Sequence, residues 1–176
     1  RYELPRPTRE DRNKLWNVKY EIAVDSQARN VYFRERMDDD FLPRAWMVGK
    51  AEIVPTDEIV EFMDTSEIDY RKVVVLEENI NYKLPETLDT NAKVTFEKYE
   101  ANKMSIKVAS NTGGMLVLSE VYYPAGWKAK LDDKEIPIYP ANYVLRGLQI
   151  PAGQHKLELV FAPESYTISI RSVSYT

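Results

Sequence analysis

The stretch "LVLSEVYYPAGWKAKLDDKEIPIY", residues 116–139, decides the fold class of this chain. Its apolar residues fall into short runs, which are separated by a Pro-Ala-Gly corner at residues 124–126 and by the polar turn "LDDKE". Short β-prone runs with turns between them predict antiparallel strands. The same stretch gathers Tyr122, Tyr123 and Trp127, so it is either a binding surface or the corner of a sheet core.

Most of the remaining chain also reads as strands. "KVTFEKYE" and "KMSIKVAS" predict a hairpin across residues 101–102, and "QHKLELVF" alternates apolar residues that face inward with charged residues that face outward. Upstream, "NVKYEIAV" and "NVYFRE" predict two short strands, residues 45–54 predict one strand, and "VVVLEE" predicts a strand buried on both faces. In "QHKLELVF" the inward residues are Leu157, Leu159 and Phe161, and the outward ones are Lys156 and Glu158.

Helical signals are confined to two segments. "PTDEIVEFMDT" predicts a helix near residues 56–64, because Thr56 can cap its first turn and acidic residues follow where the helix dipole favours them. Its apolar face is expected to consist of Ile59, Val60, Phe62 and Met63. A second short helix is expected at residues 9–16.

These elements predict a mainly β fold, an antiparallel β-sandwich or jelly-roll-like arrangement with one short helix near residues 56–64 and a short N-terminal helix. We expect an N-terminal α+β portion, residues 1–90, to pack on an antiparallel β portion, residues 91–176, in one compact unit. A length of 176 residues is enough to bury a real core. No apolar run is long enough to span a bilayer.

Composition argues against several classes of function. A net charge of −4 argues against nucleic-acid binding, which needs clustered basic residues that face the phosphates. A chain without Cys has no thiolate metal site. The single histidine, His155, has no activated nucleophile beside it and is interpreted as a half-exposed turn residue. Acidic clusters at residues 38–40, 77–78 and 132–133 lack calcium-loop spacing and are interpreted as solvated turns. We therefore predict no catalytic residue, metal or cofactor within this chain.

The aromatic residues leave two interpretations open. Trp and Tyr stack on the apolar faces of sugars while their polar edges form hydrogen bonds, but aromatic residues also fill β-cores. Exposure of the rings decides between these two uses. The candidates are Trp16, Trp46, Tyr122, Tyr123 and Trp127.

From residue 116 onward the chain resembles the C-terminal extracytoplasmic region of the YfhO-type family of bacterial polytopic membrane proteins. The resemblance rests on "LVLSEVYYPAGW", "IPIY", "AN", "RG" and "PAGQH" in this order, with "LWNVKYEI" and "LPRAWMVGKAEIV" upstream. The family's turn usually carries Asp-Gly, whereas this chain has Asp132-Asp133-Lys134, which predicts a wider turn. Ala125 looks inserted between Pro124 and Gly126. The motif residues, taken as family-motif or glycan-contacting positions, are Glu120, Tyr122, Tyr123, Trp127, Asn142, Arg146 and, upstream, Trp46.

The resemblance implies an outer domain on the extracytoplasmic face of the bacterial cytoplasmic membrane, cut from a longer protein that resembles membrane-embedded glycosyltransferases. In that class the catalytic carboxylates lie in the membrane portion, outside this chain. The expected role is therefore a non-catalytic accessory domain in cell-envelope polysaccharide glycosylation, with the protein's own transmembrane portion and an envelope glycan as partners. The alternative is a purely structural domain that packs on its own membrane portion or on a partner and binds no sugar.

One contact is also predicted from the strands themselves. Glu120 and Arg146 are the charged residues inside the two most apolar motif strands. A charge left unpaired there would cost free energy, so these two side chains are expected to pair with each other.

Overall fold

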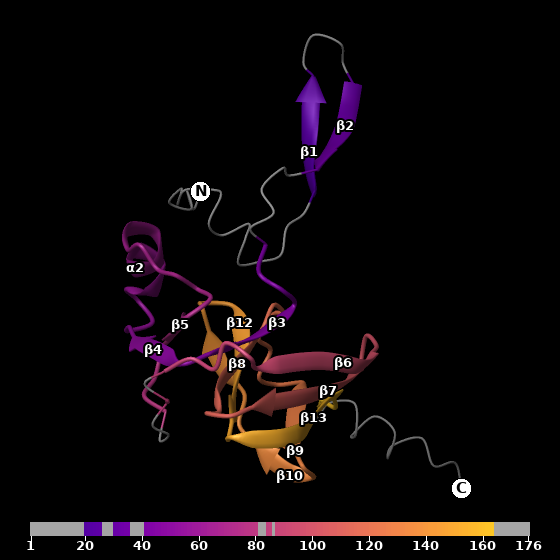
Figure 1. Cartoon of the computed structure of the whole chain (residues 1–176). Helices are drawn as coiled ribbons and strands as arrows, with labels where there is room; N and C mark the ends of the chain where they lie inside the picture. The colour runs from indigo at the N-terminus through magenta and orange to yellow at the C-terminus, as the bar shows by residue number, and fades with distance from the viewer. Residues whose placement is uncertain (1–19, 26–29, 36–40, 81–83, 86, 164–176) are drawn as a thin grey trace, which may run out of the picture.

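The computed structural model describes residues 20–25, 30–35, 41–80, 84–85 and 87–163. Two β-sheets and one short helix make up the body, and β1 (Tyr20–Asp25) pairs with β2 (Asn30–Glu35) in a separate antiparallel hairpin (Figure 1). The mainly β, sandwich-like fold expected from the sequence is thus confirmed. The expected helix at residues 9–16 lies outside the described residues.

The first sheet is antiparallel throughout, with the strand order β10-β9-β13-β7-β6. The predicted hairpin across residues 101–102 forms as expected and joins the last two strands of that order. The strands are β6 (Lys93–Tyr99), β7 (Lys103–Ser110), β9 (Trp127–Leu131), β10 (Lys134–Ile136) and β13 (Gly153–Phe161).

The second sheet has the order β3-β8-β12-β11-β5-β4 and contains one parallel pair, β4 with β5. Its strands are β3 (Ala45–Val48), β4 (Lys50–Ile53), β5 (Val73–Leu76), β8 (Gly114–Leu118), β11 (Tyr139–Ala141) and β12 (Leu145–Ile150). This sheet draws strands from both sides of residue 90.

The single strand predicted for residues 45–54 is wrong, because Gly49 divides it. The half before Gly49 pairs with β8 and the half after it pairs with β5, so the two halves occupy opposite edges of the same sheet. Only one residue separates these edges, so the sheet must curl until they meet. A Cβ at Gly49 would lie 3.2 Å from the backbone nitrogen of Leu88, which favours glycine at this junction.

The main core lies between the two sheets. Alternate residues of β7, β9 and β13 meet residues of β3, β8 and β12 there, as period-two burial requires. Leu157 and Leu159 are buried as predicted. Phe161 was expected to face inward with them, but its side chain is 39% exposed because the sheet ends there. At that end its ring lies against the rings of Tyr123 and Trp127.

The predicted helix exists as α2 (Ile59–Thr65) and packs its apolar face near Val54 and Val75, beside β4 and β5 (Figure 1). Its expected cap is wrong. The helix begins three residues later than Thr56, and the Thr56 hydroxyl instead donates a hydrogen bond of 2.8 Å to the Glu77 carboxylate.

The turn between β9 and β10 is tight, which contradicts the wider turn predicted from its lack of glycine. Leu131 pairs with Lys134, so only Asp132 and Asp133 form the loop. Both have positive φ, 47° and 66°, as a type I′ hairpin requires. Aspartate tolerates this left-handed conformation better than most residues do, which is why the hairpin closes without glycine.

Candidate functional site

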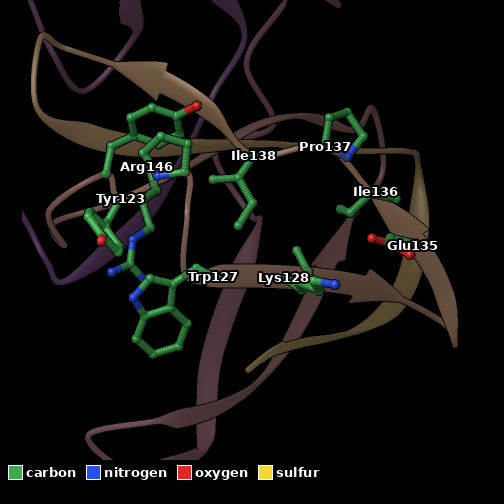
Figure 2. A pocket seen from close by; sticks show the side chains of 11 residues that line it. Tyr123, Trp127, Lys128, Glu135, Ile136, Pro137, Ile138 and Arg146 are labelled. Carbon is green, nitrogen blue, oxygen red and sulfur yellow. The ribbon is translucent and has the colours of Figure 1, made fainter. Parts of the chain in front are cut away.

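A pocket of about 260 Å³ opens where the Pro-Ala-Gly corner leads into β9 (Figure 2). One wall comes from the corner and the start of β9, and the opposite wall comes from the segment that follows β10. We call this the aromatic pocket. The side chains used below are Tyr122, Tyr123, Trp127, Lys128, Glu135 and Arg146, all of which line it.

The aromatic pocket presents its rings in two states of exposure. Tyr123 is 52% exposed, whereas Tyr122 and Trp127 are half-buried. The rings of Trp127 and Tyr123 both lie against Phe161, with centroid distances of 5.5 and 6.2 Å. The ring surfaces are therefore held by packing while one of them remains open to solvent.

Arg146 forms the floor of the aromatic pocket beside Trp127 (Figure 2). Its guanidinium carbon lies 4.2 Å from the Trp127 ring centroid, and its Nε donates a hydrogen bond of 2.9 Å to the carbonyl of Val121. Although Arg146 is only 4% exposed, its Nη1 has no hydrogen-bond partner. Burial lowers the pKa of Arg146, and the charge of Glu120 opposes that shift. The pocket thus contains a buried cationic donor with spare hydrogen-bonding capacity.

Glu120 makes its ion pair with Arg44 rather than the expected direct pair with Arg146. The Arg44 Nη1 lies 2.8 Å from the Glu120 carboxylate, and the Tyr99 hydroxyl donates to the same oxygen at 2.6 Å. Burial, followed by this hydrogen bond, raises the pKa of Tyr99. Glu120 reaches Arg146 only through a longer-range Coulomb interaction. Sequence reasoning missed Arg44 because it lies 76 residues away in the chain.

Two of the sequence candidates are buried and do not line the aromatic pocket. Trp46 lies in β3, and its Nε1 donates to the carbonyl of Tyr70 at 2.8 Å. Asn142 is fully buried, and its side-chain oxygen accepts a hydrogen bond of 2.8 Å from the Val75 amide. Both side chains complete internal hydrogen bonds. Trp16 lies outside the described residues.

His155 supports the tight hairpin instead of forming a reactive centre. Its Nδ1 lies 2.6 Å from the Asp132 carboxylate, and its Nε2 lies 3.3 Å from the carbonyl of Ala152. The second Asp132 oxygen accepts from the Lys156 amide at 2.8 Å. The hydrogen bond with His155, together with that amide, lowers the pKa of Asp132. Both ring nitrogens thus face acceptors of the chain itself.

No cluster able to hold a metal ion occurs among the described residues, and none of the described helices is long and apolar enough to cross a membrane. The acidic cluster at residues 38–40 lies outside them. The second wall of the aromatic pocket was also missed from the sequence, although "IPIY" was recognised as a motif. Its apolar residues resemble an ordinary strand, so no residue type marked them as a lining.

The comparison with protein families matches the order of these motifs to a known group. A family model described as bacterial membrane protein YfhO matches residues 12–171. The chain belongs to the YfhO family. The resemblance inferred from the motif stretch is therefore confirmed, and YfhO membership indicates a membrane-associated protein. No match was found among curated proteins or among solved structures.

Proposed function

We propose that this YfhO chain is a non-catalytic accessory domain on the extracytoplasmic face of the membrane, and that its aromatic pocket contacts a glycan of the cell envelope. The glycan belongs to the polysaccharide glycosylation in which the parent protein takes part. The observation that carries the proposal is the combination, in one pocket, of an exposed tyrosine ring, a half-buried tryptophan ring and a guanidinium whose Nη1 has no hydrogen-bond partner. Sugars offer an apolar ring face and a hydroxyl rim to such a site.

The dimensions of the aromatic pocket limit what can enter. A volume of about 260 Å³ is slightly below that of sites for drug-sized ligands, so it suits one sugar ring of a longer chain. Trp127 and Tyr123 supply the stacking surfaces, and Arg146 places a positive charge in the lining, which favours an electronegative sugar oxygen. Lys128 and Glu135 stand at the rim, where they are exposed to solvent.

Tryptophan fluorescence provides the test, because Trp127 lines the aromatic pocket and lies against Arg146. The 176-residue chain is titrated with envelope glycans up to about millimolar concentration, which corresponds to about −4 kcal/mol of binding free energy. We expect a saturable change in emission. No response at that concentration would leave the alternative, a structural domain that binds no sugar.

Two tyrosine variants separate pocket binding from general surface effects. Tyr123→Ala removes an exposed ring from the aromatic pocket, whereas Tyr143→Ala removes one of similar exposure, 46%, that does not line it. We expect Tyr123→Ala to weaken glycan binding about tenfold, within the range that one stacked ring contributes, and Tyr143→Ala to leave it unchanged. Equal effects of both substitutions would contradict a site in this pocket.

A further inference from the structure

The outward side of the first sheet carries lysines at alternate positions. Met104, Ile106 and Val108 of β7 enter the core, so Lys103 and Lys107 project from the opposite side. The same argument applies to β6, β9 and β13, whose core residues alternate with charged ones. Apart from Lys98, which lies opposite Ser105 and is paired with Glu100, six lysines share this side and are here called the lysine face: Lys93, Lys103, Lys107, Lys128, Lys130 and Lys156.

Strand register brings these lysines together although they are far apart in the sequence. Val160 lies between Lys103 on one neighbouring strand and Lys128 on the other. Glu158 lies beside Lys130, and Lys156 pairs with Lys107 across the β13–β7 ladder. Adjacent strands are about 5 Å apart, so the side chains form one continuous surface.

The lysine face has the opposite charge to the chain as a whole. Glu135 lies opposite Lys130 and shares this side, so six lysines against Glu97, Glu135 and Glu158 leave three formal positive charges on a protein whose net charge is −4. Two of the lysines are satisfied within the face, since Lys107 pairs with Glu97 and Lys156 with Glu158. The pKa of Glu158 is lowered first by Lys156 and further by Lys103 and Lys130. The lysines therefore create one continuous positive potential, and part of their charge is not neutralised within the face and can attract an anionic partner.

An apolar side chain accompanies the positive charge. Val160 is exposed in the middle of the lysine face, between Lys103 and Lys128. Lysine stems around an exposed aliphatic group are typical of surfaces that rest in the headgroup region of a bilayer. The sheet offers a broad face of several strands, which suits an extended anionic surface, and the family is one of membrane proteins.

We propose that the lysine face docks this domain on the anionic phospholipid headgroups of the membrane. Each lysine beside an anionic surface raises partitioning about fivefold, and the attraction is screened by salt. Val160 adds a shallow apolar contact. The inference does not rest on glycan binding, because Lys128 is the only one of the six lysines that also lines the aromatic pocket.

Vesicle flotation of the 176-residue chain tests this proposal. We expect the chain to float with phosphatidylcholine vesicles that contain about one-third phosphatidylglycerol, to stay unbound with pure phosphatidylcholine, and to be released at high salt. The variant K93Q/K103Q/K130Q should lower partitioning about 100-fold. It leaves Lys128, Lys107 and Lys156, and with them the aromatic pocket and both ion pairs, in place.

A matched variant controls for the loss of net charge. K50Q/K72Q/K134Q removes three lysines outside the lysine face and should change partitioning less than about fivefold. Thermal melting of both variants shows whether they fold. Equal partitioning of the two variants would overturn the proposal. So would binding to inorganic polyphosphate with no binding to the anionic vesicles, since a soluble polyanion would then be the ligand.

Discussion

Asn142 shows how one side chain can replace a length of strand pairing. Its backbone amide donates to the Val75 carbonyl, and its side-chain oxygen accepts from the Val75 amide, both at 2.8 Å. Beside it, β11 and β5 share a single residue pair, Ala141 with Leu76. The φ of 47° at Asn142 is one that asparagine tolerates better than other non-glycine residues. Asn142 therefore joins these two strands where the ladder is shortest.

Substitution of Asn142 should be costly. Asn142→Ala leaves the buried Val75 amide unpaired and puts alanine at a left-handed φ that asparagine tolerates better, so we expect a loss of about 3 kcal/mol in the free energy of unfolding. Asn142→Gly also loses the hydrogen bond to the Val75 amide, but glycine adopts the left-handed φ without strain. This variant should therefore lose only about 1 to 2 kcal/mol in the free energy of unfolding. Urea denaturation measures both. A smaller loss in the alanine variant than in the glycine variant would contradict this account.

At the scale of elements, the β9–β10 hairpin shows how a turn without glycine is stabilised. Asp132 is held by His155 and by the Lys156 amide, while Asp133 is exposed and keeps its positive φ without a contact of that kind. The strain of the two-residue loop is thus concentrated at Asp133. The hydrogen bonds at Asp132 fix the loop to the start of β13.

The hairpin can be improved at that position. Asp133→Gly should raise the free energy of unfolding by about 0.5 kcal/mol, because glycine adopts a φ of 66° without strain in a type I′ turn. Asp133→Ala should lower it by about 1 kcal/mol, since alanine tolerates this conformation less well than aspartate. Thermal or urea unfolding of the pair tests the sign. Destabilisation by both substitutions would show that Asp133 makes a contact of its own.

At the scale of the whole molecule, several carboxyl groups respond to pH in the same direction. Hydrogen bonds and lysines lower the pKa values of five of them, with Lys72 the first cause at Asp69 and the Asn111 amide the first cause at Asp89. A pKa lowered by folding contributes stability above the unfolded value, and that stability is lost as pH falls through the folded value. The groups are Asp69, Asp89, Glu97, Asp132 and Glu158.

The chain should therefore lose stability on acidification. We expect the urea midpoint to fall steadily from about pH 5 to about pH 3, where these carboxylates take up protons. Asp89→Asn removes the carboxylate that accepts from the amides of Asn91 and Asn111, so its midpoint should fall less over this range. If the urea midpoint of Asp89→Asn fell with pH as steeply as that of the unsubstituted chain, the Asp89 carboxylate would not contribute to the pH dependence of stability.

The sequence alone determined most of the strands and of their inward residues, the existence of α2 and the family, because period-two burial and turn chemistry are local and the motifs keep their order. These local sequence patterns do not indicate which strands pair with each other in a sheet. Only the tertiary structure showed that the segments before and after Gly49 lie at opposite edges of one sheet. It alone showed that Glu120 forms its ion pair with Arg44 and not with Arg146.

The two proposed sites depend on the same distinction. Tyr123 and Trp127 were visible in the motif stretch, but their exposure depends on Phe161 and on the wall after β10, which pack there only in the folded chain. The lysines alternate visibly in "WKAKL" and "HKLEL", yet nothing in either run says that these strands are neighbours. Residue chemistry and periodicity can be recognised within a short segment of sequence, whereas strand register and the path of the chain decide which side chains meet.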